Sequence, residues 1–541
     1  MERRQFLRLV GAGAGAGAAG LLAGCAAGGG PGASGRPTFS PATPVALGSG
    51  AAPLVPPTQG AAATATATTA DWAALARGLA GHLVLPADSG YSTARLAFNP
   101  RFDGVRPAAV AQCQNPDDVR ACLAFASRFR VPVVPRSGGH SYTGASSSTG
   151  LVIDVAPMNA VHADAASGSA TVGAGAKLVD VYAGLAASGV SIPAGSCPTV
   201  GVAGLALGGG VGVTGRKYGL TSDNLLAATV VTADGRVLTC NSKTEPELFW
   251  ACRGGGGGNF GVVTSLTFRT HSIGGITLFF LRWPWSQAGN VVRAWQLWAS
   301  GARDELWSNC HLLASPSQSG PQVTVGGTYL GDAGETESML EVLYAAVGSP
   351  PSSHTVEATT YAHAMGVEAG CASLSTAQCH LPWQQQGGQL AREAELAKSD
   401  FFTKPLSDAA ISAIVTAVGQ RRGLDGGGDG GIAFDAFGGA LNRPAPDATA
   451  FVHRDALFLA QYTTTWATGT AASITDTHAS WLRGFYGALH PYASGQAYQN
   501  YLDADLSNWA DAYYGANYAR LSRVKAQYDP ASLFRQPQGV A

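Results

Sequence analysis

The sequence predicts an α+β fold, and three observations support this class. A capped helix beginning near residue 115 lies between two strand-like runs, at residues 108–112 and 131–134. More short strand-like runs follow before residue 270. The 541 residues are 46% hydrophobic, which suffices for a large core and for several domains of about 150 residues each. The chain is therefore expected to be globular rather than disordered or fibrous.

The helix is predicted from its first turn. Asn115 can cap it, Pro116 suits the first turn, and Asp117 and Asp118 interact favourably with the positive end of the helix dipole. A strand, a helix and a strand within about 30 residues imply a right-handed crossover, so we expect an α/β layer here.

The segments after this unit predict further strands and one helix. Asp234-Gly235 supplies a turn between the last two strands. A glycine-rich stretch at residues 253–261 precedes another strand at residues 262–267. The other expected elements are strands at residues 151–155 and 170–172, a helix at 177–187, and strands at 227–232 and 236–239.

The charge balance excludes some classes of protein. Lys and Arg number 34 and Asp and Glu number 35, giving a net charge of -1; charged residues are 13% of the chain, against a usual share of about 25%. This composition does not favour nucleic acid as a partner. The 72 glycines follow no Gly-X-Y period, which excludes collagen.

Residues 1–25 are typical of an export signal. Arg3-Arg4-Gln5-Phe6-Leu7 resembles a twin-arginine signal, and Leu22-Ala23-Gly24-Cys25 resembles a lipobox. We expect a secreted lipoprotein, extracellular or at the cell surface, anchored in the membrane through Cys25. The alternative is a plain secretory signal with an incidental cysteine. Residues 26–70 are expected to form a flexible linker. No later segment has about 18 uninterrupted apolar residues, so no second membrane span is expected.

Three common kinds of site are not predicted. The chain has no CxxC pair, and Cys310-His311 and Cys379-His380 lack a second pair at ligand spacing, so no metal site is expected. There is no GxSxG nucleophile elbow. A GxGxxG pattern at residues 210–215 leads into Arg216-Lys217-Tyr218-Gly219 rather than into a long helix, which disfavours a Rossmann dinucleotide site.

Two loops carry potential nucleophiles beside glycine-rich backbone. Residues 136–142 read Arg-Ser-Gly-Gly-His-Ser-Tyr and place His140 in a tight turn, and residues 195–204 place Cys197 on a loop shaped by Gly and Pro. Such loops let backbone N–H groups approach a pyrophosphate closely. Taken alone, each has a plainer interpretation, a structural histidine or a small buried cysteine. No catalytic triad or metal geometry accounts for both.

Five blocks follow one another in a specific order. They are residues 136–140, 195–210, 246–261 and 449–454, and a C-terminal signature from Tyr498 to Pro530. Together they resemble the vanillyl-alcohol oxidase type of flavoproteins, with a PCMH-type FAD-binding domain, in the berberine bridge enzyme-like branch. The resemblance covers nearly all of residues 71–538 and is far more specific than any single glycine motif.

The resemblance implies a domain organisation. Residues 71–273 would form the FAD-binding domain from two α/β subdomains. Residues 274–490 would form a substrate-binding domain, with an antiparallel sheet backed by helices. Residues 491–541 would return to the FAD-binding domain.

The resemblance also implies a covalently bound FAD. His140 would bond the flavin 8α-methyl group and Cys197 the flavin C6 atom. With Cys25 and Cys197 assigned, seven of the nine cysteines remain, so at least one is unpaired in the monomer. The other residues expected to contact FAD are Arg136, Ser137, Gly138, Gly139, Ser141, Val200, Gly201, Gly204, Gly208, Gly209, Gly210, Gly212, Gly261, Val262 and Asn500.

On the substrate side, the resemblance implies that Tyr501 is the catalytic base and Asp435 its acidic partner. Tyrosine has an ordinary pKa near 10 and needs such help at neutral pH. Tyr142 and Tyr498 are expected to contact the substrate. A small Val200 near the reactive flavin edge favours O2 as the electron acceptor. Plainer interpretations remain for each: core aromatics, a buried structural aspartate, and a valine that packs the loop.

The predicted function is therefore that of an FAD-dependent oxidase. It would take hydride from an alcohol or hemiacetal carbon of a sugar, oligosaccharide or related small molecule and pass the electrons to molecular oxygen, giving H2O2. Three alternatives stay open: an oxidative tailoring enzyme for a natural product, a quinone- or protein-linked dehydrogenase, and a surface lipoprotein that keeps FAD without catalysis.

Overall fold

The computed structural model describes residues 66–424 and 427–541. Residues 67–541 belong to one compact unit. The predicted signal and the predicted linker up to residue 65 lie outside the described residues. The first described helix, α2 (Thr69–Gly78), begins inside the predicted linker, because Thr68 and Asp71 form a capping box. The predicted boundary at residue 70 therefore lies within this helix.

The first sheet has four strands in the order β1-β2-β4-β3, and α4 packs against it. Asn115 caps α4 (Pro116–Phe129) by accepting a hydrogen bond from the Asp118 backbone N–H, as predicted. β2 and β3 both run parallel to β4, so the predicted crossover unit is confirmed. The strands are β1 (His82–Val84), β2 (Ala109–Gln112), β3 (Val133–Arg136) and β4 (Leu151–Asp154).

The second sheet has five antiparallel strands in the order β5-β6-β10-β8-β9. The turn at Asp234-Gly235 joins β8 to β9, as predicted. The predicted helix is α5 (Leu178–Ala186). The strands are β5 (Val161–Asp164), β6 (Ser169–Gly173), β8 (Leu225–Val231), β9 (Val237–Asn241) and β10 (Val262–Arg269), and β7 (Val190–Ser191) pairs separately with β11 (His271–Ser272).

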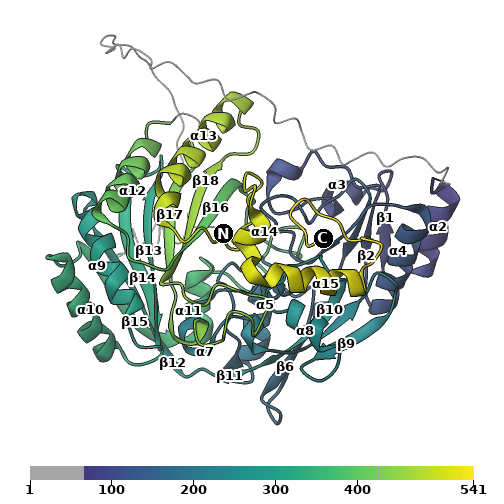
Figure 1. Cartoon of the computed structure of the whole chain (residues 1–541), viewed down its shortest axis with the longest axis horizontal. Coiled ribbons are helices and arrows are strands. Elements are labelled where there is room, and N and C mark those ends of the chain that lie inside the picture. Colours follow the sequence, from purple (N-terminus) through teal and green to yellow (C-terminus); the bar gives the residue numbers. More distant parts are fainter. Residues whose placement is uncertain (1–65, 425–426) are drawn as a thin grey trace. The chain divides into compact units, whose positions relative to one another are not determined.

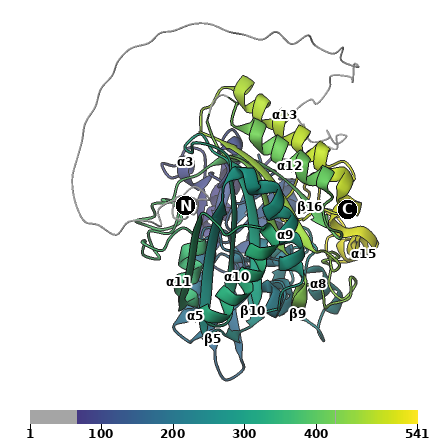
Figure 2. The same cartoon turned by 90° about the vertical axis from the view of Figure 1, so that its left-hand side faces the viewer.

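The third sheet has seven antiparallel strands in the order β15-β12-β14-β13-β17-β18-β16. Helices α9, α10, α12 and α13 cover one face of it (Figures 1 and 2). This arrangement confirms the predicted antiparallel sheet backed by helices. The strands are β12 (Gly275–Trp283), β13 (Leu306–Ala314), β14 (Gln322–Tyr329), β15 (Ser353–Thr360), β16 (Ala394–Phe402), β17 (Gly430–Ala436) and β18 (Phe458–Trp466), and the helices are α9 (Ala288–Ser300), α10 (Ala333–Val347), α12 (Asp408–Arg421) and α13 (Ala472–Leu489).

The C-terminal segment lies beside the elements of the second sheet, where α15 packs on α8 (Figure 1). The Lys525 ammonium donates hydrogen bonds to the Asn259 and Phe534 carbonyls and to Asp529, which fixes α15 on the glycine-rich loop before β10. The remaining helices are α3 (Tyr91–Ala94), α6 (Val202–Leu207), α7 (Gly215–Tyr218), α8 (Pro246–Ala251), α11 (Tyr361–Glu368), α14 (Trp509–Tyr514) and α15 (Tyr518–Tyr528).

The two largest hydrophobic cores of the described residues support this α+β architecture. One lies among the first two sheets, α5, α8 and the C-terminal helices, and the other lies between the seven-stranded sheet and its covering helices. The domain boundaries at residues 273 and 490 stay a prediction. Within the described ranges, no helix is both long enough and apolar enough to cross a membrane.

Candidate active site

A cavity of about 470 Å³ lies where the loops of the first two sheets meet the uncovered face of the seven-stranded sheet. Residues 133–142, 195–201 and 203–205 line it on one side, and side chains of β13, β17 and β18 line it on the other. The C-terminal segment contributes residues 498–502. Trp307 of β13 belongs to the same hydrophobic core as lining residues of the first two sheets such as Val133 and Leu178.

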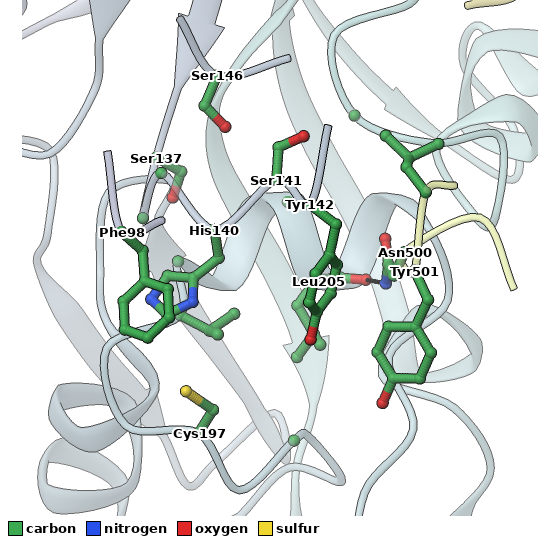
Figure 3. Close-up of a pocket in the computed structure, with 18 of the residues that line it drawn as sticks. Phe98, Ser137, His140, Ser141, Tyr142, Ser146, Cys197, Leu205, Asn500 and Tyr501 are labelled. Carbon is green, nitrogen blue, oxygen red and sulfur yellow. Dashed lines mark hydrogen bonds between the residues drawn. The ribbon is translucent and has the colours of Figure 1, made fainter. Parts of the chain in front are cut away.

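His140 and Cys197 lie close together at one end of this cavity (Figure 3). The Thr199 hydroxyl oxygen lies 2.9 Å from His140 Nε2 and 3.9 Å from Cys197 Sγ. The Phe98 ring stacks on the imidazole with 4.1 Å between ring centroids. The structure therefore brings the two predicted flavin anchors together, although they are 57 positions apart in the chain.

Both anchors have shifted pKa values. Burial, with a smaller contribution from the nearby Lys177 ammonium, lowers the pKa of His140 to about 3, so the ring is neutral at neutral pH. The Cys197 side chain is exposed to the cavity, but protein surrounds it on most sides, and this enclosure raises the pKa of its thiol. A neutral imidazole keeps a lone pair on one ring nitrogen and can act as a nucleophile.

The glycines of the cavity wall fit a flavin nucleotide. A Cβ atom built on Gly204 would meet no atom within 4 Å, so the backbone of α6 faces open space. Gly257 of the loop before β10 lies beside Gly204, since a Cβ atom built on Gly257 would be 3.8 Å from the Gly204 Cα atom, and Gly258 also lines the cavity. Gly138 packs so closely on Gly201 that a Cβ atom would overlap the backbone. Side chains at these positions would fill the space or push the two loops apart, so the wall suits an extended group held against backbone.

Three glycines predicted to contact FAD lie outside the cavity lining. Gly208, Gly209 and Gly210 pack against Asn500, Phe451 and Thr221 respectively, where a Cβ atom would overlap those side chains. These glycines are therefore required for close packing. The residues predicted to contact FAD that do line the cavity are Arg136, Ser137, Gly138, Gly139, Ser141, Val200, Gly201, Gly204, Gly212, Gly261, Val262 and Asn500.

Several of these lining residues also stabilise the loops themselves. Arg136 is buried and forms an ion pair with Asp154 at 2.8 Å. The Ser137 hydroxyl donates to the Ala174 carbonyl at 2.6 Å. The Asn500 side-chain amide donates to the Leu205 carbonyl and to the Tyr498 hydroxyl, both at 2.9 Å.

Three tyrosines form an aromatic group further along the cavity. The rings of Tyr142 and Tyr501 (Figure 3) meet edge to face with 5.7 Å between their centroids. The rings of Tyr498 and Tyr501 meet in the same way at 4.9 Å. The Tyr498 hydroxyl accepts the Gly210 backbone N–H at 2.8 Å, and burial raises the pKa of Tyr498 to about 12. Gln461 donates to the Tyr142 hydroxyl at 2.9 Å. Tyr498 therefore forms part of the wall, whereas Tyr501 is only partly buried.

The sheet side of the cavity carries polar residues that the sequence reading missed. Strand alternation directs every second residue of β13, β17 and β18 to this face, including the predicted Asp435. The missed residues are Trp307, Asn309, His311, Gln461, Thr463, and Glu368 at the end of α11. The sequence carries no clear signal for them, because the polar residues Ser308 and Thr464 interrupt a period-two pattern in the two strands.

Glu368 is an unusual member of this set. Its Oε1 atom is buried and has no hydrogen-bond partner among the described residues. Burial, and secondarily the negative charge of Asp435, raises the pKa of Glu368 to about 8. A carboxyl group that stays protonated at neutral pH therefore lies in the cavity wall.

One disulfide joins Cys371 to Cys379, a pair that the sequence did not specify. The other cysteines of the described ranges are free thiols. In the same ranges, no group of three His, Cys, Asp or Glu side chains is arranged to hold a metal ion.

Two family matches bear on this site. Residues 107–241 match the FAD binding domain family, and residues 497–541 match the family described as berberine and berberine like. The first match contains His140 and Cys197, and the second contains Tyr498 and Tyr501. The two matched segments therefore include both predicted anchors and the predicted base.

Whole-chain similarity extends over most of the described residues. The chain is 34% identical to the uncharacterized FAD-linked oxidoreductase YgaK of Bacillus subtilis, over 85% of this chain and 97% of that protein. It is 32% identical to the solved structure of BBE-like 1 from Physcomitrella patens, with a TM-score of 0.78 over 86% of this chain and 98% of that one. A chitooligosaccharide oxidase is 28% identical, with a TM-score of 0.77 over 87% and 99%.

Proposed function

The chain belongs to the berberine bridge enzyme-like family of FAD-linked oxidoreductases, and we propose that it is an oxidase of hydroxylated small molecules with FAD bound covalently through His140 and Cys197. One observation carries this proposal. The predicted anchors, the predicted base Tyr501 and a polar sheet face all line the same cavity. A cofactor held at one end would therefore face a substrate held against the sheet.

Covalent attachment fits the chemistry of the two anchors. His140 is neutral, and its Nε2 atom is engaged by Thr199, which leaves Nδ1 as the nitrogen for attachment. Cys197 opens to the same space. FAD bound there would accept hydride from the substrate carbon and pass the electrons to oxygen.

Tyr501 is proposed to take the hydroxyl proton of the substrate while hydride leaves the adjoining carbon. Its ring is fixed by the edge-to-face contacts with Tyr142 and Tyr498. Asp435 is proposed to assist Tyr501 by accepting the proton that the Tyr501 hydroxyl releases on ionisation. Fixed geometry matters because proton and hydride must leave aligned atoms in one step.

A carbohydrate is the proposed substrate class. Asn309, His311, Gln461 and Thr463 offer hydrogen-bonding groups on the sheet face, and Trp307 offers an aromatic surface on which a sugar ring could stack. The similar chitooligosaccharide oxidase and a similar xylooligosaccharide oxidase, at 26% identity, support this choice.

Oxygen is the proposed electron acceptor, because Val200 leaves a small side chain at the cavity wall beside Cys197. A dehydrogenase is the second candidate. A grass pollen allergen of similar structure, at 27% identity, has glucose dehydrogenase activity. The two candidates differ in how fast photoreduced protein loses its electrons to air.

The proposal extends to the location of the protein. We propose export through the twin-arginine route and lipid anchoring at Cys25, from the sequence of residues 3–7 and 22–25. Replacing Arg3 and Arg4 by lysine should keep the protein in the cytoplasm, and Cys25→Ala should release it from the membrane fraction. Unchanged fractionation of both variants would refute this part.

The first experiment tests attachment and chemistry together. The purified protein should be yellow, the colour should stay with the acid-precipitated pellet, and the peptides that contain His140 and Cys197 should each carry the flavin mass. Tyr501→Phe should keep both attachments but lose anaerobic bleaching by sugar substrates. Tyr492→Phe is the control, because Tyr492 is exposed and lies outside the cavity. Bleaching of Tyr501→Phe at the wild-type rate would remove Tyr501 from the role of base.

A further inference from the structure

Thr199 occupies a position between the two proposed flavin anchors. Its side chain is 2% exposed, and its hydroxyl oxygen lies 2.9 Å from His140 Nε2 and 3.9 Å from Cys197 Sγ. We propose that Thr199 is a positioning residue for flavin attachment, and that a strap of the chain, residues 371–392, holds it in place. The inference rests on the proposed function, because it requires His140 to carry FAD.

The Thr199 hydroxyl can form a hydrogen bond with His140 Nε2 both before and after attachment. In the proposed arrangement before attachment, the Nε2–H tautomer donates across the 2.9 Å contact to the hydroxyl oxygen, so the lone pair resides on Nδ1. After Nδ1 has formed its bond, the neutral ring has a lone pair on Nε2, and the hydroxyl can donate to it. A hydroxyl group is both donor and acceptor, so serine should replace threonine here and the isosteric valine should not.

The attachment step balances with oxygen as the second reactant. A flavin C–H bond is replaced by a C–N bond to Nδ1, and the imidazole loses its Nε2 proton. The two electrons and two protons released are taken up by O2 as H2O2. His140 must therefore present a lone pair and then lose a proton, and burial, with a smaller contribution from the neighbouring Lys177 charge, disfavours a persistent imidazolium.

The strap lies between α11 and β16, and the Cys371–Cys379 disulfide closes its first part. Gln384 Nε2 donates to the Thr199 backbone carbonyl at 3.2 Å. His380 Nε2 lies 3.0 Å from the Asp180 carboxylate on α5, which fixes the strap on the flavin side. The backbone of Thr199 is thus hydrogen-bonded to a residue 185 positions later in the chain.

The end of the strap holds the other neighbour of His140. Arg392 donates from Nε to the Phe98 carbonyl at 3.1 Å and forms an ion pair with Asp103. Phe98 is the residue whose ring stacks on His140. Neither Gln384 nor Arg392 lines the cavity. The strap can therefore affect attachment through Thr199 and Phe98 without touching FAD or substrate.

The first test compares Thr199→Val with Thr199→Ser by peptide mass. In Thr199→Val, we expect the fraction of His140 peptide that carries flavin to fall at least about tenfold. A tenfold change corresponds to about 1.4 kcal/mol of preference for the ring position that allows attachment. Thr199→Ser should keep the wild-type fraction. Equal fractions in wild type and Thr199→Val would overturn the inference.

The second test addresses the strap with two isosteric changes. Gln384→Glu keeps the oxygen that accepts the Leu381 backbone N–H but loses the donor to Thr199. The control is Gln385→Glu, which places the same charge on an exposed neighbour. We expect incomplete attachment at His140 in the first variant and complete attachment in the second. Complete attachment in both variants would overturn the role of the strap. This test does not depend on whether Thr199→Val folds.

The peptide masses of the wild-type protein distinguish a failure of this inference from a failure of the proposed function. If neither the His140 peptide nor the Cys197 peptide of the wild type carries flavin, the proposed covalent FAD fails and this inference fails with it. If both peptides carry flavin and Thr199→Val behaves like wild type, only this inference fails.

Discussion

The contribution of Glu368 to the free energy of unfolding should fall between about pH 4.5 and pH 8, and Glu368→Gln should remove this contribution. Glu368 ends α11 and lines the cavity. Burial, and then the charge of Asp435, raises the pKa of its carboxyl group from 4.5 to about 8. The unfolded chain ionises at the ordinary pKa, whereas the folded chain keeps the proton for several pH units more.

The sign and size of the effect follow from linkage. Between the two pKa values the unfolded state binds fewer protons than the folded state, so the free energy of unfolding decreases as pH rises and becomes level above the folded pKa. Each pKa unit corresponds to about 1.4 kcal/mol, so the rise to about 8 costs at most about 5 kcal/mol. Glutamine has the shape of the protonated acid and does not ionise.

Equilibrium urea unfolding at about pH 5, 7 and 9 would measure this difference. The free energy of unfolding of Glu368→Gln should exceed that of the wild type by an amount that grows with pH. Glu341→Gln, at an exposed position on α10, is the matched control and should follow the wild type. A constant offset between Glu368→Gln and wild type at all three pH values would refute the shifted ionisation.

Three further predictions concern other parts of the site. Lys398→Met should lower the free energy of unfolding by about 3–5 kcal/mol, measured in urea, because it leaves the buried Asp503 carboxylate without its ion pair; a loss under about 1 kcal/mol would contradict this. Gly204→Leu should place a side chain in the cavity and abolish flavin absorbance while the far-UV spectrum is kept; a yellow variant would contradict the glycine wall. Cys197→Ala should retain acid-stable colour through His140 alone, and colourless pellets would contradict attachment at two points.

The predictions from sequence succeeded where the signal is local. The cap at Asn115 and the turn at Asp234-Gly235 lie within the elements they define, so α4 and the β8–β9 hairpin were found to within a few residues. The seven-stranded sheet has no such signal. β13 pairs with β14 and with β17, which begins at Gly430, so its order depends on long-range contacts. That sheet was expected only through the family resemblance.

The distinction between local signals and long-range contacts also applies to the candidate site. His140 and Cys197 lie in blocks whose residue order is specific. Glu368, His311 and Gln461 belong to three different elements, and only the sheet register and the path of α11 bring them to one cavity. Glycine clusters are ambiguous in sequence, because a glycine that adjoins a ligand and a glycine that packs against a side chain look alike.

The C-terminal segment explains how Tyr501 can be aligned with both sides of the cavity. Tyr498 binds the Gly210 backbone on the flavin side through its hydroxyl group. Lys398 of β16 binds Asp503 at 2.8 and 2.9 Å on the sheet side. Tyr501 lies between these two attachments in the chain, so neither side can shift without moving it. Because proton removal and hydride transfer require simultaneous alignment, loosening either attachment should slow flavin reduction more than it weakens substrate binding.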